Sequence, residues 1–365
     1  MRVDFNYLPS EFGNSKKILR EWKKLIKSCD FTLGQYVEKV QLNFANYTGA
    51  KYCLAVNSGT DALILSLRSL SISSGDEVIT SANTFYATAG AIVACGAKPI
   101  LVDVDSRYQI NVNEIQKKIT KKTKAIIAVH WGGASPDMVA IKKIAKKYNL
   151  FIIEDACMGI GGLCNGKHPG TIGDIGAFSL HPIKTLNAIG DGGFFVTNNK
   201  KIYDWAKTYR NHGMINRDQI SMWGVNMRMQ PLQAVVAIEG LKKIDSVIKK
   251  RNLNALYLDS KLSSLENYIS IPKRIKKDKE TYSLYMILVK NRDRLYNYLK
   301  RNKIDCKIHY PIPLSSQKPY VTKEKNGFKA ANFQAKNLIT LPIHQYLSKK
   351  HLDYMYKKIE IFYAK

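Results

Sequence analysis

The chain has 365 residues, of which 45% are hydrophobic and 24% are charged, and its net charge is +28. These values are typical of a globular protein, and the length predicts one large domain with a smaller one. No apolar run approaches the roughly 18–20 residues that a membrane-spanning helix needs. The N-terminal segment contains Asp4 and no apolar core, so it is not a secretory signal. We therefore expect a cytoplasmic protein that does not bind a membrane.

The excess of lysine does not predict a nucleic-acid partner. Binding to phosphates needs Lys and Arg gathered on one surface or arm, whereas these lysines occur in pairs spread along the chain. A solvated surface explains them, although the positive field would favour an anionic small substrate. The six cysteines lack CxxC spacing, so we expect reduced thiols and no metal site.

Residues 50 to 200 alternate short β-rich runs with helical patterns, which predicts βα units and a doubly wound α/β core with a mostly parallel sheet. The expected strands are 52–56, 77–80, 99–103, 125–130, 151–154, 176–180 and 193–197. The expected helices before and between them are 15–28, 36–47, 60–70, 85–95, 112–119 and 137–148.

The pattern after the sheet predicts a second, α+β region. Residues 231–265 indicate one long helix. Pro231 is compatible with it, because proline is tolerated in a first helical turn. They are followed by a strand at 282–289, a helix at 292–301, a loop at 308–320 and a final helix after Leu347. We expect a large domain over 1–250, which includes the N-terminal helices, and a small C-terminal domain over 251–365.

One lysine differs from the others in its surroundings. Lys184 lies in the segment 178–193, FSLHPIKTLNAIGDGG, among apolar, small and turn-forming residues. An amine in such a segment loses hydration, which favours its neutral form and lets it attack a carbonyl carbon. The alternative is a loop lysine that reaches solvent, as most lysines do.

Two further segments carry candidate binding groups. NSGTDAL at 57–63 joins an expected strand to an expected helix, so the N–H groups at the start of that helix could hold a phosphate. Alternatively, Ser58 or Thr60 is an ordinary helix cap and Gly59 makes the turn. In FIIEDAC, Asp155 follows an apolar strand at the edge where open sheets bind ligands. Its carboxylate could bind a metal, a ribose hydroxyl or a protonated ring nitrogen, or cap a helix. A metal is disfavoured because no other ligands lie nearby in the sequence.

The segment GGLCNGKH at 161–168 matches the GxxxxGK pattern of a phosphate-binding loop. The match fails in context, because His168 replaces the magnesium-binding Ser or Thr and Pro169 prevents a helix from beginning there. A β-turn at Asn165 and Gly166 fits better. No GxGxxG follows the first expected strand, which argues against a nicotinamide dehydrogenase.

Lys184, Asp155, the NSGT turn and Phe85, an aromatic residue at the start of an expected helix, form one coherent set. A pyridine ring with an aldehyde and a phosphate needs a lysine, a carboxylate that keeps its nitrogen protonated, N–H donors and a stacking partner. This set predicts pyridoxal phosphate as the cofactor. The ring is the electron sink, and the released lysine is the acid and base at the substrate carbon.

The chain resembles the DegT/DnrJ/EryC1/StrS sugar aminotransferases, a branch of the fold-type I pyridoxal-phosphate enzymes. The segments that carry the resemblance, in family order, are LGQYVEKVQLNFANYTGAKYCLAVNSGTDAL, GDEVITSANTFYATAGAI, VHWGGASPDM, EDAC, GAFSLHPIKTLNAIGDGG, WGVNMRMQPLQA and HYPIPL. It implies a homodimer with active sites shared between subunits. It also implies transfer of an amino group, usually from glutamate, to a keto sugar on a nucleotide diphosphate, for surface polysaccharide or glycoconjugate synthesis.

The resemblance implies a role for each candidate cofactor residue. Lys184 corresponds to the lysine that binds the cofactor aldehyde, and Asp155 to the partner of the pyridine nitrogen. The phosphate contacts that it implies are Ser58, Gly59, Thr60 and Ser179. Phe85 would stack on the ring, and Asn226 would contact the phosphate bound by the neighbouring subunit.

The substrate side of the site departs from the family pattern. His309 and Tyr310 match the family's substrate-binding HYP segment, with a packed loop as the alternative. Met158 stands where members often have Gln or His, and a thioether cannot donate a hydrogen bond to the cofactor's phenolic oxygen. Ser315 follows Leu314 where the family has His, so sugar contacts there are in doubt.

Two alternatives to a keto-sugar aminotransferase remain at this point. One is a related enzyme that acts on a cyclitol ketone. The other is a regulatory or ligand-binding protein that keeps the fold and the cofactor without turnover. Lys184, Asp155 and Asn226 together argue against the second alternative, and the presence of Lys184 argues against variants in which the lysine is replaced and the reaction is a dehydration.

Overall fold

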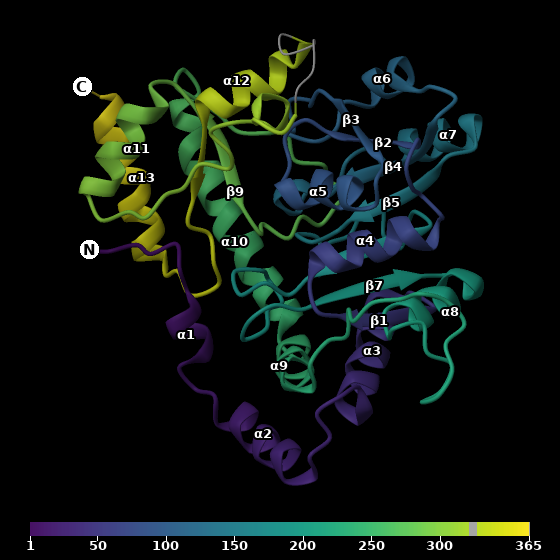
Figure 1. Cartoon of the computed structure of the whole chain (residues 1–365). Helices are drawn as coiled ribbons and strands as arrows, with labels where there is room; N and C mark the ends of the chain where they lie inside the picture. Colours follow the sequence, from purple (N-terminus) through teal and green to yellow (C-terminus); the bar gives the residue numbers. More distant parts are fainter. Residues whose placement is uncertain (321–326, 365) are drawn as a thin grey trace.

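The computed structural model describes residues 1–320 and 327–364, which fold around two β-sheets (Figure 1). The large sheet has the strand order β1–β7–β6–β5–β4–β2–β3, in which β7 runs antiparallel to both its neighbours and the other pairs are parallel. Its strands are β1 (Tyr52–Val56), β2 (Glu77–Ser81), β3 (Lys98–Val102), β4 (Thr123–Val129), β5 (Phe151–Asp155), β6 (Ile175–Ser179) and β7 (Gly193–Thr197). The predicted mostly parallel α/β sheet is confirmed, because each expected strand lies within two residues of an observed one.

Helices cover both faces of the large sheet because neighbouring residues of each strand point to opposite faces. On β7, Phe195 packs with α4, α5 and α8, whereas Phe194 packs with α3 and α9. The helices around this sheet are α2 (Lys16–Ser28), α3 (Gly34–Thr48), α4 (Gly59–Ser69), α5 (Tyr86–Ala94), α6 (Val112–Ile115), α7 (Met138–Tyr148), α8 (Lys200–Tyr209) and α9 (Pro231–Leu241). The sheet is therefore a buried central layer, and we call it with these helices the large lobe.

A second, smaller sheet has the antiparallel order β10–β9–β8 and its own apolar core. Its strands are β8 (Ile269–Ser270), β9 (Tyr285–Val289) and β10 (Leu338–Leu341). Its helices are α11 (Arg292–Arg301), α12 (Lys329–Asn337) and α13 (Lys349–Tyr363). We call this sheet with these helices the small lobe.

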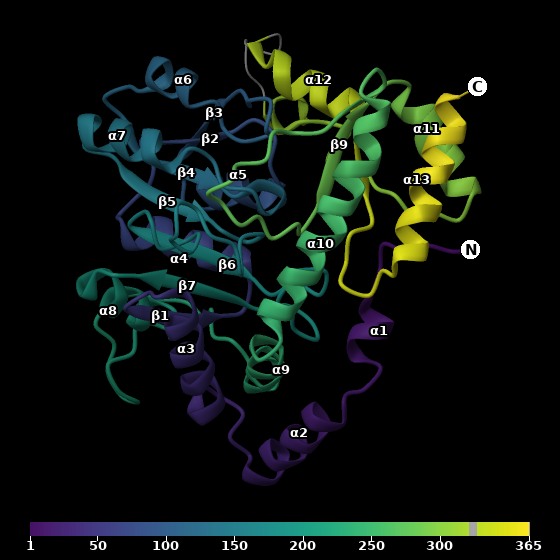
Figure 2. The same cartoon turned by 180° about the vertical axis from the view of Figure 1, so that it is seen from behind.

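The predicted single helix over 231–265 is wrong, because the structure has two helices there, α9 and α10 (Ile244–Leu262). The first helix ends at Leu241 and the second begins at Ile244, and Lys242 and Lys243 form a turn between them. The break changes the direction of the chain, so that α9 packs on α2 and α3 while α10 extends along α13 (Figure 2).

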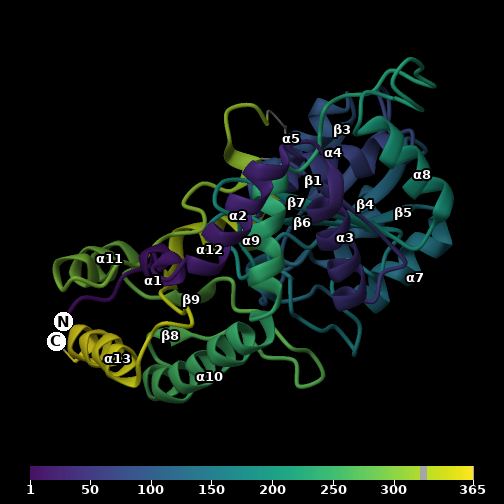
Figure 3. The same ribbon diagram turned by 90° about the horizontal axis from the view of Figure 1, so that it is seen from below.

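Helix α10 joins the two cores, because Ile248 packs in the large lobe and Leu258 packs in the small lobe. The predicted domain boundary after residue 250 falls within this helix and stays a prediction. Near the N-terminus, Val3 forms an isolated β-bridge with Ile304 and packs in the small lobe. Both chain ends consequently lie beside α11 and α13 (Figure 3).

Several short elements have no counterpart in the predictions. They are α1 (Leu8–Phe12), α8, α12, β8 and β10, and each is short or rich in polar residues. Across residues 1–320 and 327–364, every helix lacks either the length or the apolar character that a bilayer span requires.

Candidate active site

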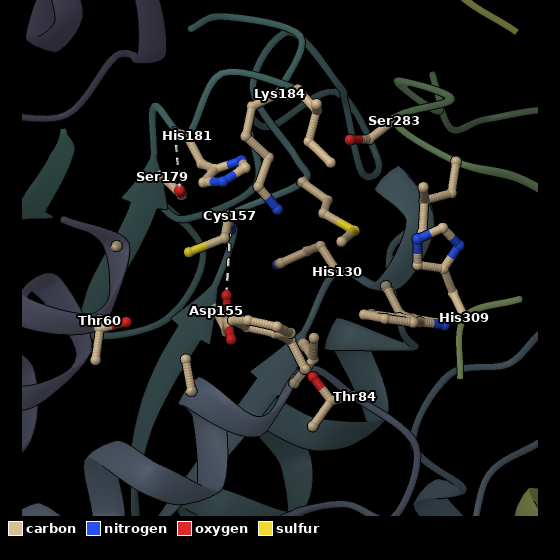
Figure 4. Close-up of a pocket in the computed structure, with 18 of the residues that line it drawn as sticks. Thr60, Thr84, His130, Asp155, Cys157, Ser179, His181, Lys184, Ser283 and His309 are labelled. Atoms are coloured by element: carbon tan, nitrogen blue, oxygen red, sulfur yellow. Dashed lines mark hydrogen bonds between the residues drawn. The ribbon is translucent and has the colours of Figure 1, made fainter. Parts of the chain in front are cut away.

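A cavity of about 270 Å³ lies at the carboxyl ends of β5 and β6, between the start of α4 and residues of the small-lobe side (Figure 4). The predicted site residues that line it are Ser58, Gly59, Thr60, Phe85, Asp155, Ser179, Lys184, His309 and Tyr310. Asn226 is exposed in the loop before α9, where its Oδ1 accepts a hydrogen bond from the N–H of Arg228 at 3.2 Å, and it does not line the cavity. The fold thus brings together groups that are far apart in the sequence.

The side chain of Lys184 points into this cavity toward Cys157 and Asp155 (Figure 4). Its main chain is fixed by two hydrogen bonds: its N–H donates to His181 O at 2.8 Å, and its carbonyl accepts from the Tyr7 hydroxyl at 2.7 Å. Burial lowers the pKa of the Lys184 amine, and the nearby Cys157 and Asp155 oppose this shift. A lowered pKa increases the neutral, nucleophilic fraction of the amine.

Asp155 ends β5 with a buried carboxylate held by two donors. The Thr88 hydroxyl donates to Oδ2 at 2.7 Å, and the Cys157 N–H donates to Oδ1 at 3.3 Å. The chain after Asp155 forms turns, so this residue caps no helix there. Its carboxylate is therefore oriented toward the cavity, where it can accept from a protonated ring nitrogen.

The N-terminus of α4 reaches the edge of the cavity. Ser58 is the N-cap, and its hydroxyl accepts from the Asp61 N–H at 3.0 Å. A Cβ on Gly59 would lie 2.7 Å from the Ser179 Cβ and 2.9 Å from the Cys157 Sγ, so only glycine lets the helix begin this close to β6. The N–H groups of a first helical turn have no partner within the helix, and the helix dipole favours an anion beside them.

Ser179 adds a hydroxyl to the same edge. Its Oγ accepts a hydrogen bond from the His181 N–H at 3.2 Å, so its own proton can be donated to a ligand. The capping role considered for the NSGT turn and the anion-binding role are therefore compatible, because the cap uses the Asp61 N–H and leaves the N–H groups of Gly59 and Thr60 for a ligand.

Aromatic rings form the opposite wall. Phe85 is the N-cap residue before α5 and has an exposed fraction of 45%, and its ring centroid lies 6.1 Å from that of Tyr310. The Tyr310 ring lies 5.6 Å from that of Trp131. His309 Nδ1 is 3.0 Å from the Thr340 hydroxyl, and burial, with the nearby Lys184, lowers the pKa of His309 to about 4. His309 and Tyr310 are thus packed in a loop and also line the cavity.

The two departures from the family pattern lie in different places. Met158 lines the cavity, and its carbonyl accepts from the Thr281 hydroxyl at 2.6 Å. Leu314 and Ser315 are buried under the loop, where the Leu314 N–H donates to Ala82 O at 3.0 Å. Neither Leu314 nor Ser315 lines the cavity.

Sequence reasoning missed part of the cavity floor. His130 lines the cavity and lies with Nε2 2.8 Å from the carboxylate of the fully buried Glu154. Burial acts to raise the pKa of Glu154, but the bonds to His130 and to the N–H groups of Gly170 and Gly173 hold it below its ordinary value. The VHWGG and NTFYAT segments, which contain His130 and Thr88, were the available signal.

The GxxxxGK match is a turn, as expected. Cys164 and Lys167 exchange two backbone hydrogen bonds of 2.8 and 3.0 Å, and Asn165 and Gly166 between them have φ of +48° and +78°. This geometry is a tight hairpin turn. It confirms that the segment is not a phosphate-binding loop.

In the protein without cofactor, we expect an amine-acylating reagent to modify Lys184 at a lower pH than free lysine. The reason is that only the neutral amine reacts, and burial lowers the pKa of Lys184 from 10.5. Mass spectrometry of peptides over a pH series gives the labelling midpoint, with the exposed Lys207 of α8 as the control in the same digest. Equal midpoints for the two lysines would contradict this expectation.

The comparisons with known proteins agree with this geometry. A sequence model of the DegT/DnrJ/EryC1/StrS aminotransferase family matches residues 14–360. A dTDP-3-amino-3,6-dideoxy-alpha-D-galactopyranose transaminase of Aneurinibacillus thermoaerophilus is 36% identical over 340 residues, which cover 93% of each chain. A pleiotropic regulatory protein of Geobacillus stearothermophilus is 33% identical over 368 residues, which cover 100% of this chain and 99% of the relative.

A solved structure shows the same fold. The crystal structure of DesV from S. venezuelae superposes with a TM-score of 0.96 at 28% identity, covering 100% of this chain and 99% of the other. The expected fold-type I architecture and the expected cofactor class are therefore confirmed. The chain belongs to the DegT/DnrJ/EryC1/StrS aminotransferase family, whose members depend on pyridoxal phosphate.

Proposed function

We propose that this aminotransferase moves an amino group from glutamate to a keto sugar carried on a nucleotide diphosphate, for a surface polysaccharide or glycoconjugate. The observation that carries the proposal is that the Lys184 amine and the Asp155 carboxylate face one cavity beside the N-terminus of α4. The A. thermoaerophilus relative is named as a transaminase of a dTDP-linked sugar, which supports the substrate class. The cytoplasmic location stays a prediction.

The residues around the cavity fit pyridoxal phosphate in their chemistry. The close approach of Gly59 to Ser179 sets N–H and hydroxyl donors side by side for a phosphate, with Ser58 and Thr60 next to them. Asp155 would hold the protonated ring nitrogen, and Phe85 would cover one face of the ring. When bound, the cofactor supplies an aldehyde that carries the amino group and a ring that accepts electrons.

Lys184 is the group best suited to move a proton at the substrate carbon. Its amine is neutral more often than that of an ordinary lysine, so it can accept a proton and return it. Burial and the nearby Asp155 raise the pKa of Cys157 well above its ordinary value, so this thiol stays protonated and cannot act as a base. His309 is engaged by Thr340.

The proposal includes a homodimer whose subunits complete each other's sites. The loop before α9 exposes large apolar side chains, with Trp223 at 88% and Ile215 at 66% exposed. A second copy that covers this loop would remove them from water. Asn226 lies in the same loop and outside its own chain's cavity, so a twofold contact could bring it to the partner's phosphate.

Regulation without turnover is the second candidate function. It is favoured by one observation, the name of the G. stearothermophilus relative as a pleiotropic regulatory protein. A cyclitol ketone is the other candidate substrate. An assay that measures the reaction with the amino donor and the reaction with the keto acceptor separately distinguishes all three possibilities.

The test of the proposal uses the purified protein loaded with pyridoxal phosphate. We expect glutamate to yield 2-oxoglutarate in a single turnover, and one member of a panel of dTDP-, UDP- and GDP-linked 3-keto and 4-keto sugars to sustain repeated turnover. Lys184→Ala should give no turnover while staying folded, whereas Lys207→Ala should match the wild type. No 2-oxoglutarate from the wild-type protein would favour regulation, and turnover with a cyclitol ketone alone would correct the substrate class.

Asp155→Asn should keep the cofactor but slow the reaction with glutamate by about a hundredfold, because an amide cannot stabilise a protonated ring nitrogen as a carboxylate does. Stopped-flow absorbance of the bound cofactor measures this step. Asp137→Asn is the matched control, since Asp137 caps α7 through a bond to the Ala140 N–H at 2.9 Å. A near-normal rate for Asp155→Asn would show that this carboxylate is structural.

The shared site is tested by mixing subunits. Lys184→Ala and Asn226→Ala chains should form hybrid dimers in which one site receives the intact lysine from one subunit and the intact asparagine from the other. Such hybrids should have up to about half the activity of a wild-type dimer. Exchange is verified by mass spectrometry of differently tagged chains. Verified exchange without recovery, or a fully active monomer, would refute the shared site.

A further inference from the structure

The N-terminal segment of the chain touches the main chain of Lys184. Tyr7, which directly precedes α1, is buried with 5% of its surface exposed. Its hydroxyl donates to the Lys184 carbonyl oxygen at 2.7 Å, across 177 positions of sequence. Burial raises the pKa of Tyr7, so the hydroxyl keeps the proton that it donates.

The ring of Tyr7 is itself held in place. The guanidinium carbon of Arg251 in α10 lies 5.2 Å from its centroid, and the His344 ring lies 5.3 Å from it. Arg251 is almost fully buried at 2% exposed, and its Nη1 donates to Tyr282 O at 3.0 Å. Its Nε donates to Gln345 Oε1 at 3.1 Å. The hydroxyl of Tyr7 therefore has little freedom to follow a moving loop.

The same contacts reach the opposite wall of the cavity. Arg251 binds the carbonyl of Tyr282, and the next two residues, Ser283 and Leu284, line the cavity. Tyr7 packs on Arg251 and binds Lys184. The two groups thus connect the lysine on one wall to the small-lobe side on the other.

Two other hydrogen bonds join the loop that carries Lys184 to neighbouring elements: the Thr185 hydroxyl donates to Ile160 O at 3.3 Å, and Gln233 Nε2 donates to Ile189 O at 2.5 Å. The Lys184 N–H donates to His181 O, and Asn187 Nδ2 donates to Pro182 O at 2.9 Å, and both of these bonds are within the loop. The Tyr7 hydroxyl is the bond that ties the carbonyl of Lys184 to a distant segment. Losing it would free the Lys184 carbonyl from its distant partner without removing any group that lines the cavity.

We infer that Tyr7 is a positioning residue that fixes the main chain of Lys184 and so keeps its amine buried and aimed into the cavity. The inference rests on the proposed function only in taking Lys184 as the reacting amine. Tyr7 itself does not line the cavity, so it acts through Lys184 and touches neither substrate nor cofactor.

The test removes one hydroxyl, with a matched control. Tyr7→Phe deletes the hydrogen bond to Lys184. The control is Tyr363→Phe in α13, far from the cavity, which deletes an equivalent bond from the Tyr363 hydroxyl to the Lys290 carbonyl at 2.6 Å. In the cofactor-free protein, we expect the acylation midpoint of Lys184 to rise toward that of free lysine in Tyr7→Phe only. In the loaded protein, kcat should fall about tenfold with KM nearly unchanged, the size expected for one hydrogen bond.

The outcomes separate this inference from the proposed function. An unchanged acylation midpoint in Tyr7→Phe, an equal shift in Tyr363→Phe, or loss of the folded state as a whole would overturn the positioning role. If the acylation midpoint of Lys184 shifts in Tyr7→Phe but the wild-type protein forms no 2-oxoglutarate from glutamate, the positioning role is upheld and the proposed function is refuted. A circular dichroism melt of each variant shows which case applies.

Discussion

The arrangement of the site depends on one steric constraint, the contact between the first turn of α4 and the end of β6. A side chain at Gly59 would collide with Ser179, and a side chain at Gly193 would lie 2.5 Å from the carbonyl oxygen of Ser58. With glycine at both positions, the helix N-terminus lies against the strand end. The partial positive charge of the helix, the hydroxyl of Ser179 and the loop that carries Lys184 consequently share one edge of the sheet.

Two adjacent acidic residues of β5, Glu154 and Asp155, lie on opposite faces of the strand and have different surroundings. Neighbouring residues of a strand point to opposite faces, so Glu154 is fully buried beneath the site while Asp155 faces the cavity. Glu154 is compensated by His130 and by backbone N–H groups of the loop before β6, which fixes that loop. A buried charge is costly unless it is paired in this way. One acid therefore supports the cavity from beneath and the other lines it.

The sequence predicted the large sheet well because its strands are short, apolar and flanked by turn residues, so local pattern and burial agree. The helix over 231–265 was predicted wrongly because the break at Lys243 is imposed by packing against two different lobes, which a local pattern does not record. Lys184 and Asp155 were proposed as site residues because their chemistry contrasts with their neighbours, and both line the cavity. Tyr7 gave no such signal, because its role comes from contacts with residues far along the chain. Asn226 was proposed from the family resemblance alone, and in the single chain it lies outside the cavity.

The bond between Tyr7 and Lys184 also sets an order in which the site is completed during synthesis. Tyr7 and Lys184 are both synthesised well before the residues that hold the tyrosine ring, Arg251 and His344. Domains tend to form in the order in which they are translated. The large sheet can thus form before the lysine's peptide is secured, and the Lys184 carbonyl reaches its final surroundings only after His344 has been added.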